Sequence, residues 1–213
     1  MKTVAPDFGI FLSKLSSLDE NNAFKEFLPS EESLIKMEKK AKEDRRSALE
    51  LIKNSNFLLG VYTKIMVFLE KSVEEPSLID YRKIIAEQAG ISDDELLMIY
   101  KVSLEFYEEK NFDKAIVIAG LLSFLNPEIS AFWRMQGACF YQLNDFNAAL
   151  IVYLFASMIN SLEILNHIAC MECLLRLGFT EAALSYYNTA REVLNMADQT
   201  HDLLVLDEFF KKA

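Results

Sequence analysis

The chain is poor in the residues that build irregular or cross-linked structures. Its 213 residues include only six glycines, four prolines and three cysteines. Such low glycine and proline contents argue against an irregular, turn-rich architecture. Three cysteines do not make a disulfide framework, and free thiols are typical of a reducing cytoplasm. We therefore predict a helical intracellular protein, with 52% hydrophobic residues providing an ample core.

The chain also lacks long apolar runs and an excess of basic residues. Its longest apolar runs, residues 57–69 with Lys64 inside and residues 148–159, are too short to span a bilayer and indicate buried helices. No apolar leader precedes Asp7, so no signal peptide is predicted. With 32 acidic and 22 basic residues, the net charge of −10 disfavours nonspecific nucleic-acid binding. We predict neither membrane insertion nor a nucleic-acid partner.

Motifs for catalysis or metal binding are missing as well. The sequence has no phosphate-binding glycine loop and no nucleophile elbow. Its only candidate catalytic bases are the two histidines, His167 and His201. His167, Cys170 and Cys173 recur every third residue, but a fourth metal ligand is not supplied. We therefore predict no enzymatic activity, no metal and no cofactor.

What the chain does contain is a threefold repeat in its second half. Four kinds of residue recur there with spacings of 34 and then 33 residues. The columns are a small residue (Ser103, Gly137, Cys170), an aromatic or thiol residue (Phe106, Phe140, Cys173), a turn aromatic (Phe112, Phe146, Phe179) and an alanine (Ala115, Ala149, Ala182). Small residues let two helices approach closely, and the large residues fill the space beside the crossing.

A period near 34 is the signature of tetratricopeptide helix pairs. Trp133 occupies the leading aromatic position of the second unit, and Pro127 ends the first unit. An ordinary helical bundle is the alternative, but it does not explain the recurring turn aromatic followed by an alanine. We predict an all-α protein with three tetratricopeptide helix pairs in a concave solenoid, an N-terminal helical extension and a C-terminal capping helix over residues 198–213.

The boundary between extension and repeats is predicted near residue 90. Gly90 ends a helical pattern, and Ser92 with Glu95 forms a capping box that begins the first repeat helix. We therefore divide the chain into an N-terminal helical region, residues 1–90, and a repeat domain, residues 91–213. A final amphipathic helix with Leu203, Leu204, Leu206 and Phe210 facing inward completes the second part.

Three segments are distinguished upstream of residue 90. An apolar stripe runs from Phe8 to Leu28, and a helix from Ser30 to Lys53 carries interleaved acids and bases typical of a solvated face. In residues 54–70, apolar side chains cover most of the helix circumference, so packing on the repeats cannot bury them all. A subunit interface would bury them, and we predict a homodimer through these N-terminal helices.

The ligand is predicted to lie against the first helices of the repeats. Positions two, five, nine and twelve of a first helix share one face, which lines the concavity in this repeat type. The positions are Leu97, Tyr100, Leu104 and Tyr107, then Ala131, Arg134, Ala138 and Tyr141, then Ile164, His167, Met171 and Leu174. Such an apolar and aromatic lining suits an extended peptide. The alternative is that Tyr100 and Tyr107 only pack between helices.

Several strings resemble one family. They are Ile99-Tyr100 with Leu104, Tyr107 and Phe112–Ala115, then Gly137–Cys139 and Phe146–Ala149, then Glu172–Leu175, Gly178 and Glu181-Ala182. This stretch, about Leu96 to Leu194, resembles the class II chaperones of bacterial type III secretion. The resemblance implies a cytoplasmic tetratricopeptide protein that binds membrane-active translocator subunits before export and holds a short extended stretch of them.

Two functions from different classes follow. The first is a secretion chaperone, which the resemblance implies and the charge-poor lining favours. The second is a general tetratricopeptide scaffold in a stable complex. A scaffold that grips a carboxylate tail needs several cations in its groove, and Arg134 alone does not supply them. A third possibility, implied by the resemblance alone, is a regulatory role through a transcription activator. The sequence neither supports nor excludes it.

Overall fold

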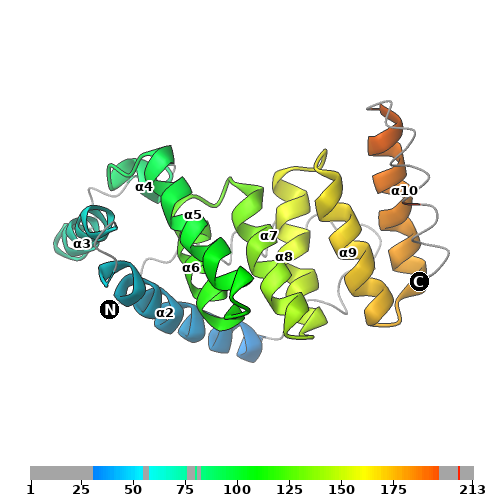
Figure 1. The fold of residues 1–213 in the computed structure, drawn as a ribbon, viewed down its shortest axis with the longest axis horizontal. Coiled ribbons are helices and arrows are strands. Elements are labelled where there is room, and N and C mark those ends of the chain that lie inside the picture. The colour runs from blue at the N-terminus through cyan, green and yellow to red at the C-terminus, as the bar shows by residue number, and fades with distance from the viewer. Residues whose placement is uncertain (1–30, 55–57, 76–79, 81–82, 197–205, 207–213) are drawn as a thin grey trace.

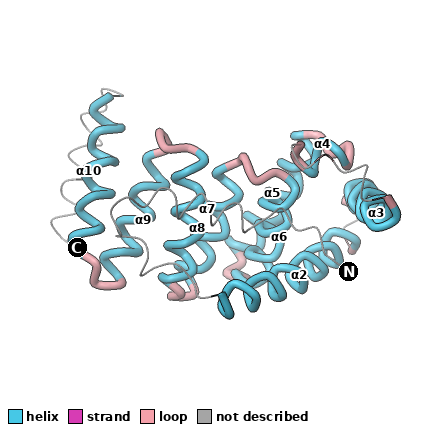
Figure 2. The backbone as a smooth tube through the Cα atoms, turned by 180° about the vertical axis from the view of Figure 1, so that it is seen from behind, coloured by secondary structure: helices cyan, strands magenta, loops and turns pink. Residues whose placement is uncertain are grey.

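The computed structural model describes residues 31–54, 58–75, 80, 83–196 and 206. Every regular element within these ranges is a helix (Figures 1 and 2). The helices are α2 (Glu31–Lys53), α3 (Leu59–Glu74), α4 (Ile85–Gln88), α5 (Asp93–Glu108), α6 (Phe112–Leu125), α7 (Ser130–Gln142), α8 (Phe146–Ile159), α9 (Ile164–Arg176) and α10 (Thr180–Met196). None of these helices combines the length and apolar content needed to cross a membrane.

Three helix pairs follow one another along the long axis of the molecule (Figure 1). Helix α5 packs on α6, α7 on α8, and α9 on α10, while α6 and α8 also pack on the first helix of the next pair. The predicted all-α repeat architecture is therefore confirmed. The predicted capping helix lies outside the described residues except for Leu206, which is buried among side chains of the third pair.

The second helices of the first two pairs form the centre of the stack. Helix α6 has eight buried residues between Ala115 and Leu125, and α8 has six between Ala149 and Ser157. Each has neighbours on more than one side, because α6 contacts α2, α5 and α7, and α8 contacts α7 and α9. A helix enclosed in this way needs apolar residues all round. This explains the long apolar run over residues 148–159.

Small residues set the helix crossings within the pairs. A Cβ atom placed on Gly137 of α7 would lie 2.6 Å from the ring of Tyr153 on α8, closer than any real contact. In the first pair, the buried Ser103 hydroxyl donates a 3.0 Å hydrogen bond to the Ala115 carbonyl on α6. A small side chain at this position therefore lets the second helix approach, as the sequence predicts for Ser103 and Gly137.

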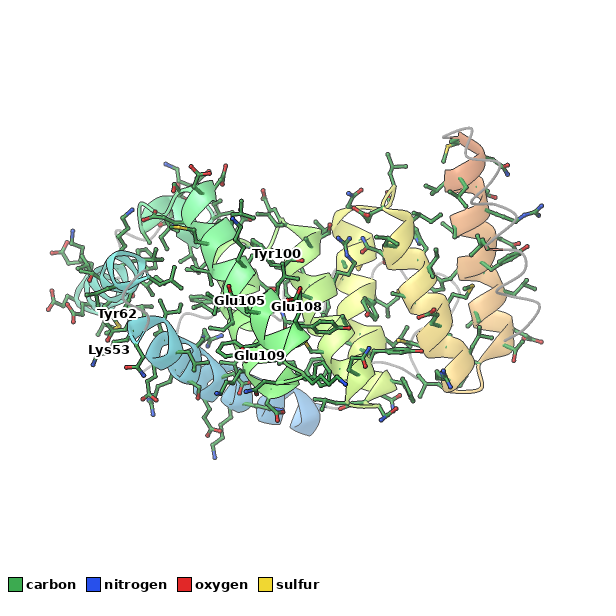
Figure 3. The ribbon with its side chains drawn as sticks, viewed as in Figure 1. Lys53, Tyr62, Tyr100, Glu105, Glu108 and Glu109 are labelled. Carbon is green, nitrogen blue, oxygen red and sulfur yellow. The ribbon has the colours of Figure 1, made fainter. Side chains whose placement is uncertain are left out.

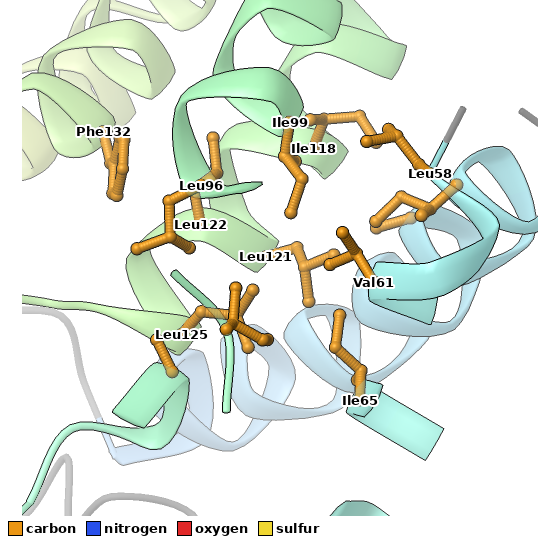
Figure 4. Close-up of a cluster of buried hydrophobic side chains, with 14 residues drawn as sticks. Leu58, Val61, Ile65, Leu96, Ile99, Ile118, Leu121, Leu122, Leu125 and Phe132 are labelled. Carbon is orange, nitrogen blue, oxygen red and sulfur yellow. The ribbon is translucent and has the colours of Figure 1, made fainter. Parts of the chain in front are cut away.

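The N-terminal helices share a core with the first repeat. Ile52 of α2, together with Leu58, Val61 and Ile65 at α3, joins a cluster that also contains residues of α5, α6 and α7 (Figure 4). The cluster is contiguous, so part of the apolar surface predicted for residues 54–70 is buried on the repeats. The division at residue 90 stays a prediction about folding units, since the described helices on its two sides share this core.

The start of α5 is fixed by a capping box and an ion pair. The Glu95 amide donates to the Ser92 hydroxyl at 3.3 Å, and the Ser92 amide donates to the Glu95 carboxylate at 2.9 Å. Lys64 of α3 donates to both Glu95 oxygens at 2.7 Å and, as the largest cause, lowers the pKa of that carboxyl. Gly90, with a φ of 66°, precedes this cap in the left-handed conformation. The predicted helix start is confirmed.

Two other predictions lie wholly or partly outside the described residues. The apolar stripe from Phe8 to Leu28 and the cap at Ser30 fall among residues 1–30. The charged helix is α2, which ends at Lys53 as predicted. The next helix, α3, continues to Glu74, one turn beyond the predicted end at residue 70.

A matched pair of glycine substitutions tests the crossing. Gly137→Ala places a methyl group against the buried Tyr153 ring, and we expect the free energy of unfolding to fall by about 1–3 kcal/mol. Gly120→Ala on α6 meets only the Gln136 side chain, at 3.8 Å, and should leave stability unchanged or raise it by about 0.5–1 kcal/mol through helix propensity. Denaturant unfolding measures both, and equal losses would contradict the crossing described here.

Candidate peptide-binding face

The three repeats follow one another at a constant spacing, whereas the sequence pattern alone predicts a third repeat that begins one residue early. Each first helix ends before a residue in the left-handed conformation: Lys110 (φ 60°), Asn144 (φ 60°) and Gly178 (φ 84°). The amide after that residue donates back to the carbonyl of Phe106, Phe140 or Leu174, at 2.8, 3.0 and 2.9 Å. The interval from Lys110 to Asn144 equals that from Asn144 to Gly178, so the three helix ends are equivalent.

The corrected register changes the third member of each column. The buried alanine equivalent to Ala115 and Ala149 is Ala183, which is fully buried, and the predicted Ala182 is only partly buried. Phe179 takes the place of Asn111 and Asp145, one residue before the second helix, and is 40% exposed. Met171, fully buried, stands where Gly137 stands in the second pair. The predicted columns for Cys170, Cys173, Phe179 and Ala182 are therefore wrong by one residue.

With the shifted register, the α9 residues predicted to line the groove no longer belong to the candidate face. One residue turns a helix by about 100°. His167, Met171 and Leu174 are 6%, 0% and 3% exposed and pack in the core of the third pair, so they do not form a surface. Ile164 is half-buried at the start of α9. Gly178 is the signal that could have corrected the register, because glycine is the favoured residue at a left-handed helix end.

With the register corrected, one face runs across the three first helices. We call it the first-helix face, and its members occupy equivalent positions in the three repeats. They are Leu97, Tyr100, Leu104 and Tyr107 on α5, Ala131, Arg134, Ala138 and Tyr141 on α7, and Leu165, Ile168, Glu172 and Leu175 on α9. Leu97 and Leu165 are 49% and 52% exposed, and the other ten are partly buried. The eight residues predicted on α5 and α7 all retain exposed surface.

Two tyrosines of this face are held in the same way. The Tyr107 ring meets Phe112 edge-on, with centroids 5.4 Å apart, and Tyr141 meets Phe146 in the same manner at 5.2 Å. Each hydroxyl is directed toward the end of the next first helix: Gln142 donates to the Tyr107 oxygen at 3.3 Å, and Tyr141 is the main cause that raises the pKa of Arg176. Both rings are therefore fixed before any ligand arrives.

Tyr100 extends the aromatic surface on α5. Its ring lies 5.7 Å from that of Phe132 on α7, and burial raises the pKa of its hydroxyl. The hydroxyl is therefore neutral and can donate or accept a hydrogen bond. The exposed acids Glu105, Glu108 and Glu109 follow Tyr100 toward the end of α5 (Figure 3). The α5 part of the face is thus apolar and aromatic, with acidic residues near one end.

The cation on α7 already has partners. Arg134 lies 3.5 Å from a Glu163 oxygen and donates to the Asn166 side-chain oxygen at 3.5 Å. Glu163 and Asn166 belong to the start of the third repeat, so the contact joins neighbouring pairs. The positive charge is thereby compensated within the chain, and Arg134 is not available as an uncommitted anion-binding group.

The histidine and cysteines of α9 serve packing. The His167 Nε2 atom lies 2.7 Å from the Ser161 carbonyl, and its ring packs near Tyr186. Cys170 and Cys173 are buried free thiols, and burial raises the pKa of Cys173 to about 12. Within the described ranges, no three histidine, cysteine or acidic side chains come together as a metal site.

No protein-family model and no curated protein matches this chain. Solved structures do share its fold. The type III secretion translocator chaperone SycD of Yersinia enterocolitica is 22% identical, with a TM-score of 0.57, over 62% of this chain and 98% of its own. PcrH, solved in complex with the chaperone-binding region of PopD, is 24% identical with a TM-score of 0.53, over 58% of this chain and 93% of its own.

The fold is also shared outside secretion. The TPR2B domain of yeast Sti1, solved in a complex with pHsp70, is 14% identical with a TM-score of 0.52, over 55% of this chain and 94% of its own. The tetratricopeptide fold and the resemblance to translocator chaperones are thus confirmed. At these identities the likeness shows the fold alone. The nature of the ligand has to be inferred from the residues of the first-helix face.

Thiol labelling tests the register of α9. Leu165→Cys should react quickly with a maleimide, because Leu165 is half exposed, whereas Leu174→Cys should react as slowly as the three buried native cysteines. The native thiols are the internal control, since burial raises the pKa of both Cys139 and Cys173 to about 12. Fast labelling at position 174 and slow labelling at 165 would restore the register predicted from the sequence.

Proposed function

We propose that this protein is a bacterial cytoplasmic chaperone that binds the membrane-active translocators of a type III secretion system and keeps them soluble before export. It would do so by holding an extended apolar peptide against the first-helix face. The observation that carries the proposal is the α5 and α7 part of that face. There, leucine, alanine and prearranged tyrosine side chains surround a cation whose charge is already compensated.

The proposed role requires only non-covalent binding of the client peptide. Leu104 and Ala138 offer apolar surface for the side chains of a peptide, and affinity would come from burial of apolar area at about 25 cal/mol per Å². Tyr100 can hydrogen-bond the peptide backbone, because its hydroxyl is neutral. The rings of Tyr107 and Tyr141 lose little freedom on binding, since Phe112 and Phe146 already fix them. A catalytic step is not part of this proposal.

The likeness to the Sti1 domain, which was solved in a complex with pHsp70, favours a second candidate, a general tetratricopeptide scaffold. A scaffold that grips a charged carboxylate tail needs cations directed at the ligand. Here Arg134 is paired with Glu163 and Asn166, and α9 brings Glu172 to the face. An acid and a neutralised arginine disfavour an anionic peptide, so the apolar client is the better supported ligand.

We further propose that the chain forms a homodimer through its N-terminal helices. Helix α3 buries Val61 and Ile65 on the repeats, yet Leu59, Val67 and Val73 of the same helix are 50%, 44% and 70% exposed. Packing on the repeats thus leaves apolar side chains of α3 in contact with water, as the sequence analysis expected. A second copy that covers them would remove this exposed apolar surface.

Peptide titration separates the two candidate ligands. We expect a ten-residue translocator peptide with capped ends and no charged side chains to keep its affinity between low salt and roughly 0.5 M salt, because apolar burial is not screened. Replacing Tyr100 and Tyr107 by alanine should weaken binding at least tenfold, while Tyr107→Phe, which keeps the ring, should weaken it little. Binding that needs a free carboxylate or falls steeply with salt would favour the scaffold.

Light scattering tests the dimer. We expect the full-length protein at micromolar concentration to have the mass of two chains, and Leu59→Glu with Val67→Glu to shift it toward one chain. The exposed positions of both side chains should keep the melting temperature nearly unchanged. Lys71→Glu on the same helix is the control for added negative charge. A wild-type monomer would contradict self-association.

A further inference from the structure

We infer that Glu172 forms a subsite on the first-helix face for a lysine or arginine side chain of the bound peptide, a proposal that rests on the proposed function. The subsite would make this chaperone selective for clients that carry a basic residue beside their apolar anchors. It deepens the peptide-holding role by adding one charged contact to an otherwise apolar interaction.

The corrected register brings Glu172 to the face. Leu104, Ala138 and Glu172 occupy equivalent positions on α5, α7 and α9. Two contacts between neighbouring repeats are also equivalent to each other: Tyr100 of α5 meets Phe132 of α7, and Arg134 of α7 meets Asn166 of α9. Glu172 therefore continues a row whose other two members are apolar.

The Glu172 carboxylate makes no direct contact with a donor or cation in the described part of the chain, and Arg176 acts on it only through charge at a longer distance. Neither a hydrogen bond nor an ion pair to it is formed there. The side chain is partly buried, and its burial raises the pKa of the carboxyl, while Arg176 acts in the opposite direction. Its oxygens still reach solvent, since the one described atom that is both buried and unpartnered is His167 Nδ1. A partly desolvated, unpaired carboxylate is a favourable place for a donor.

The cations nearest to Glu172 along this face are engaged elsewhere. Arg134 is paired with Glu163 and Asn166. Arg176, one helical turn beyond Glu172, is exposed, and the largest influence on its pKa is Tyr141, which raises it. Neither arginine forms an ion pair with Glu172. The position is thus open to a cation that arrives with the ligand.

The ligand chemistry follows from the single charge and the geometry. One carboxylate is too few oxygen ligands for a hard metal ion, and it repels anions, whereas a charge-assisted hydrogen bond to an ammonium or guanidinium group needs only one acceptor. Ala138 and Glu172 lie at equivalent positions of neighbouring repeats, so one extended peptide that crosses both would place its basic residue on the α9 side of the anchor that meets Ala138.

A lysine scan of a neutral peptide tests the subsite. The probe is the capped ten-residue translocator peptide, with each position in turn changed to lysine, norleucine or glutamate, titrated against the full-length protein. We expect one position, or two adjacent ones, at which lysine binds about tenfold more tightly than norleucine. Glu172→Gln should abolish that difference, and Glu172→Lys should turn it into a preference for glutamate.

The control variant is Glu181→Gln, which changes the net charge equally at an exposed position of α10 and should keep the lysine preference. Unchanged circular-dichroism melting would show that Glu172→Gln is folded. A lysine scan that is flat, or that is the same in Glu172→Gln, overturns the subsite and leaves the binding of the neutral peptide intact. Failure of the neutral peptide itself to bind would overturn both the peptide-binding face and the subsite.

Discussion

The close contact between Gly137 and the Tyr153 ring determines how the central helix pair crosses, and the rest of the stack is built on that pair. Helix α7 packs on α6 before it and α8 behind it, so its orientation is fixed from two sides. This orientation directs Arg134, Ala138 and Tyr141 to one face. A side chain larger than hydrogen at position 137 would force the Tyr153 ring or one of the two helices to shift, and a shift of α7 would displace the face with it.

The chain separates the residues that stabilise it from those that we propose meet a ligand. Side chains within the pairs, such as Ile118 and Ala149, are fully buried, whereas the first-helix face keeps half-buried rings and leucines. Tyr107 and Tyr141 belong to both groups, because their rings pack on the turn phenylalanines Phe112 and Phe146, and the Tyr107 hydroxyl contacts the next repeat. Repeat proteins gain binding surface in this manner, since each repeat contacts only its neighbours and one face remains open.

Much of the fold could be predicted from the sequence because its signals are local. Gly90, Ser92 and Glu95 mark the start of α5, and the small residues Ser103 and Gly137 mark two crossings, all of which the structure confirms. The predicted alignment of the third repeat was wrong because Phe179 and Ala182 match the aromatic and alanine positions of the other repeats one residue early. With that alignment, Glu172 was not assigned to the first-helix face, whereas the buried residues His167 and Met171 were assigned to it. The pairing of Arg134 with Glu163 was also missed, because it depends on how two repeats meet in space.

The central claim is that the protein holds an apolar translocator segment until export. The most direct measurement is purification of the full-length protein from its own cells at native levels, followed by mass spectrometry of the proteins that accompany it and of their stoichiometry. The account predicts a membrane-active secreted protein in near-equal amount, retained in roughly 0.5 M salt because apolar contacts are not screened. A resident metabolic or structural complex in its place would contradict the account.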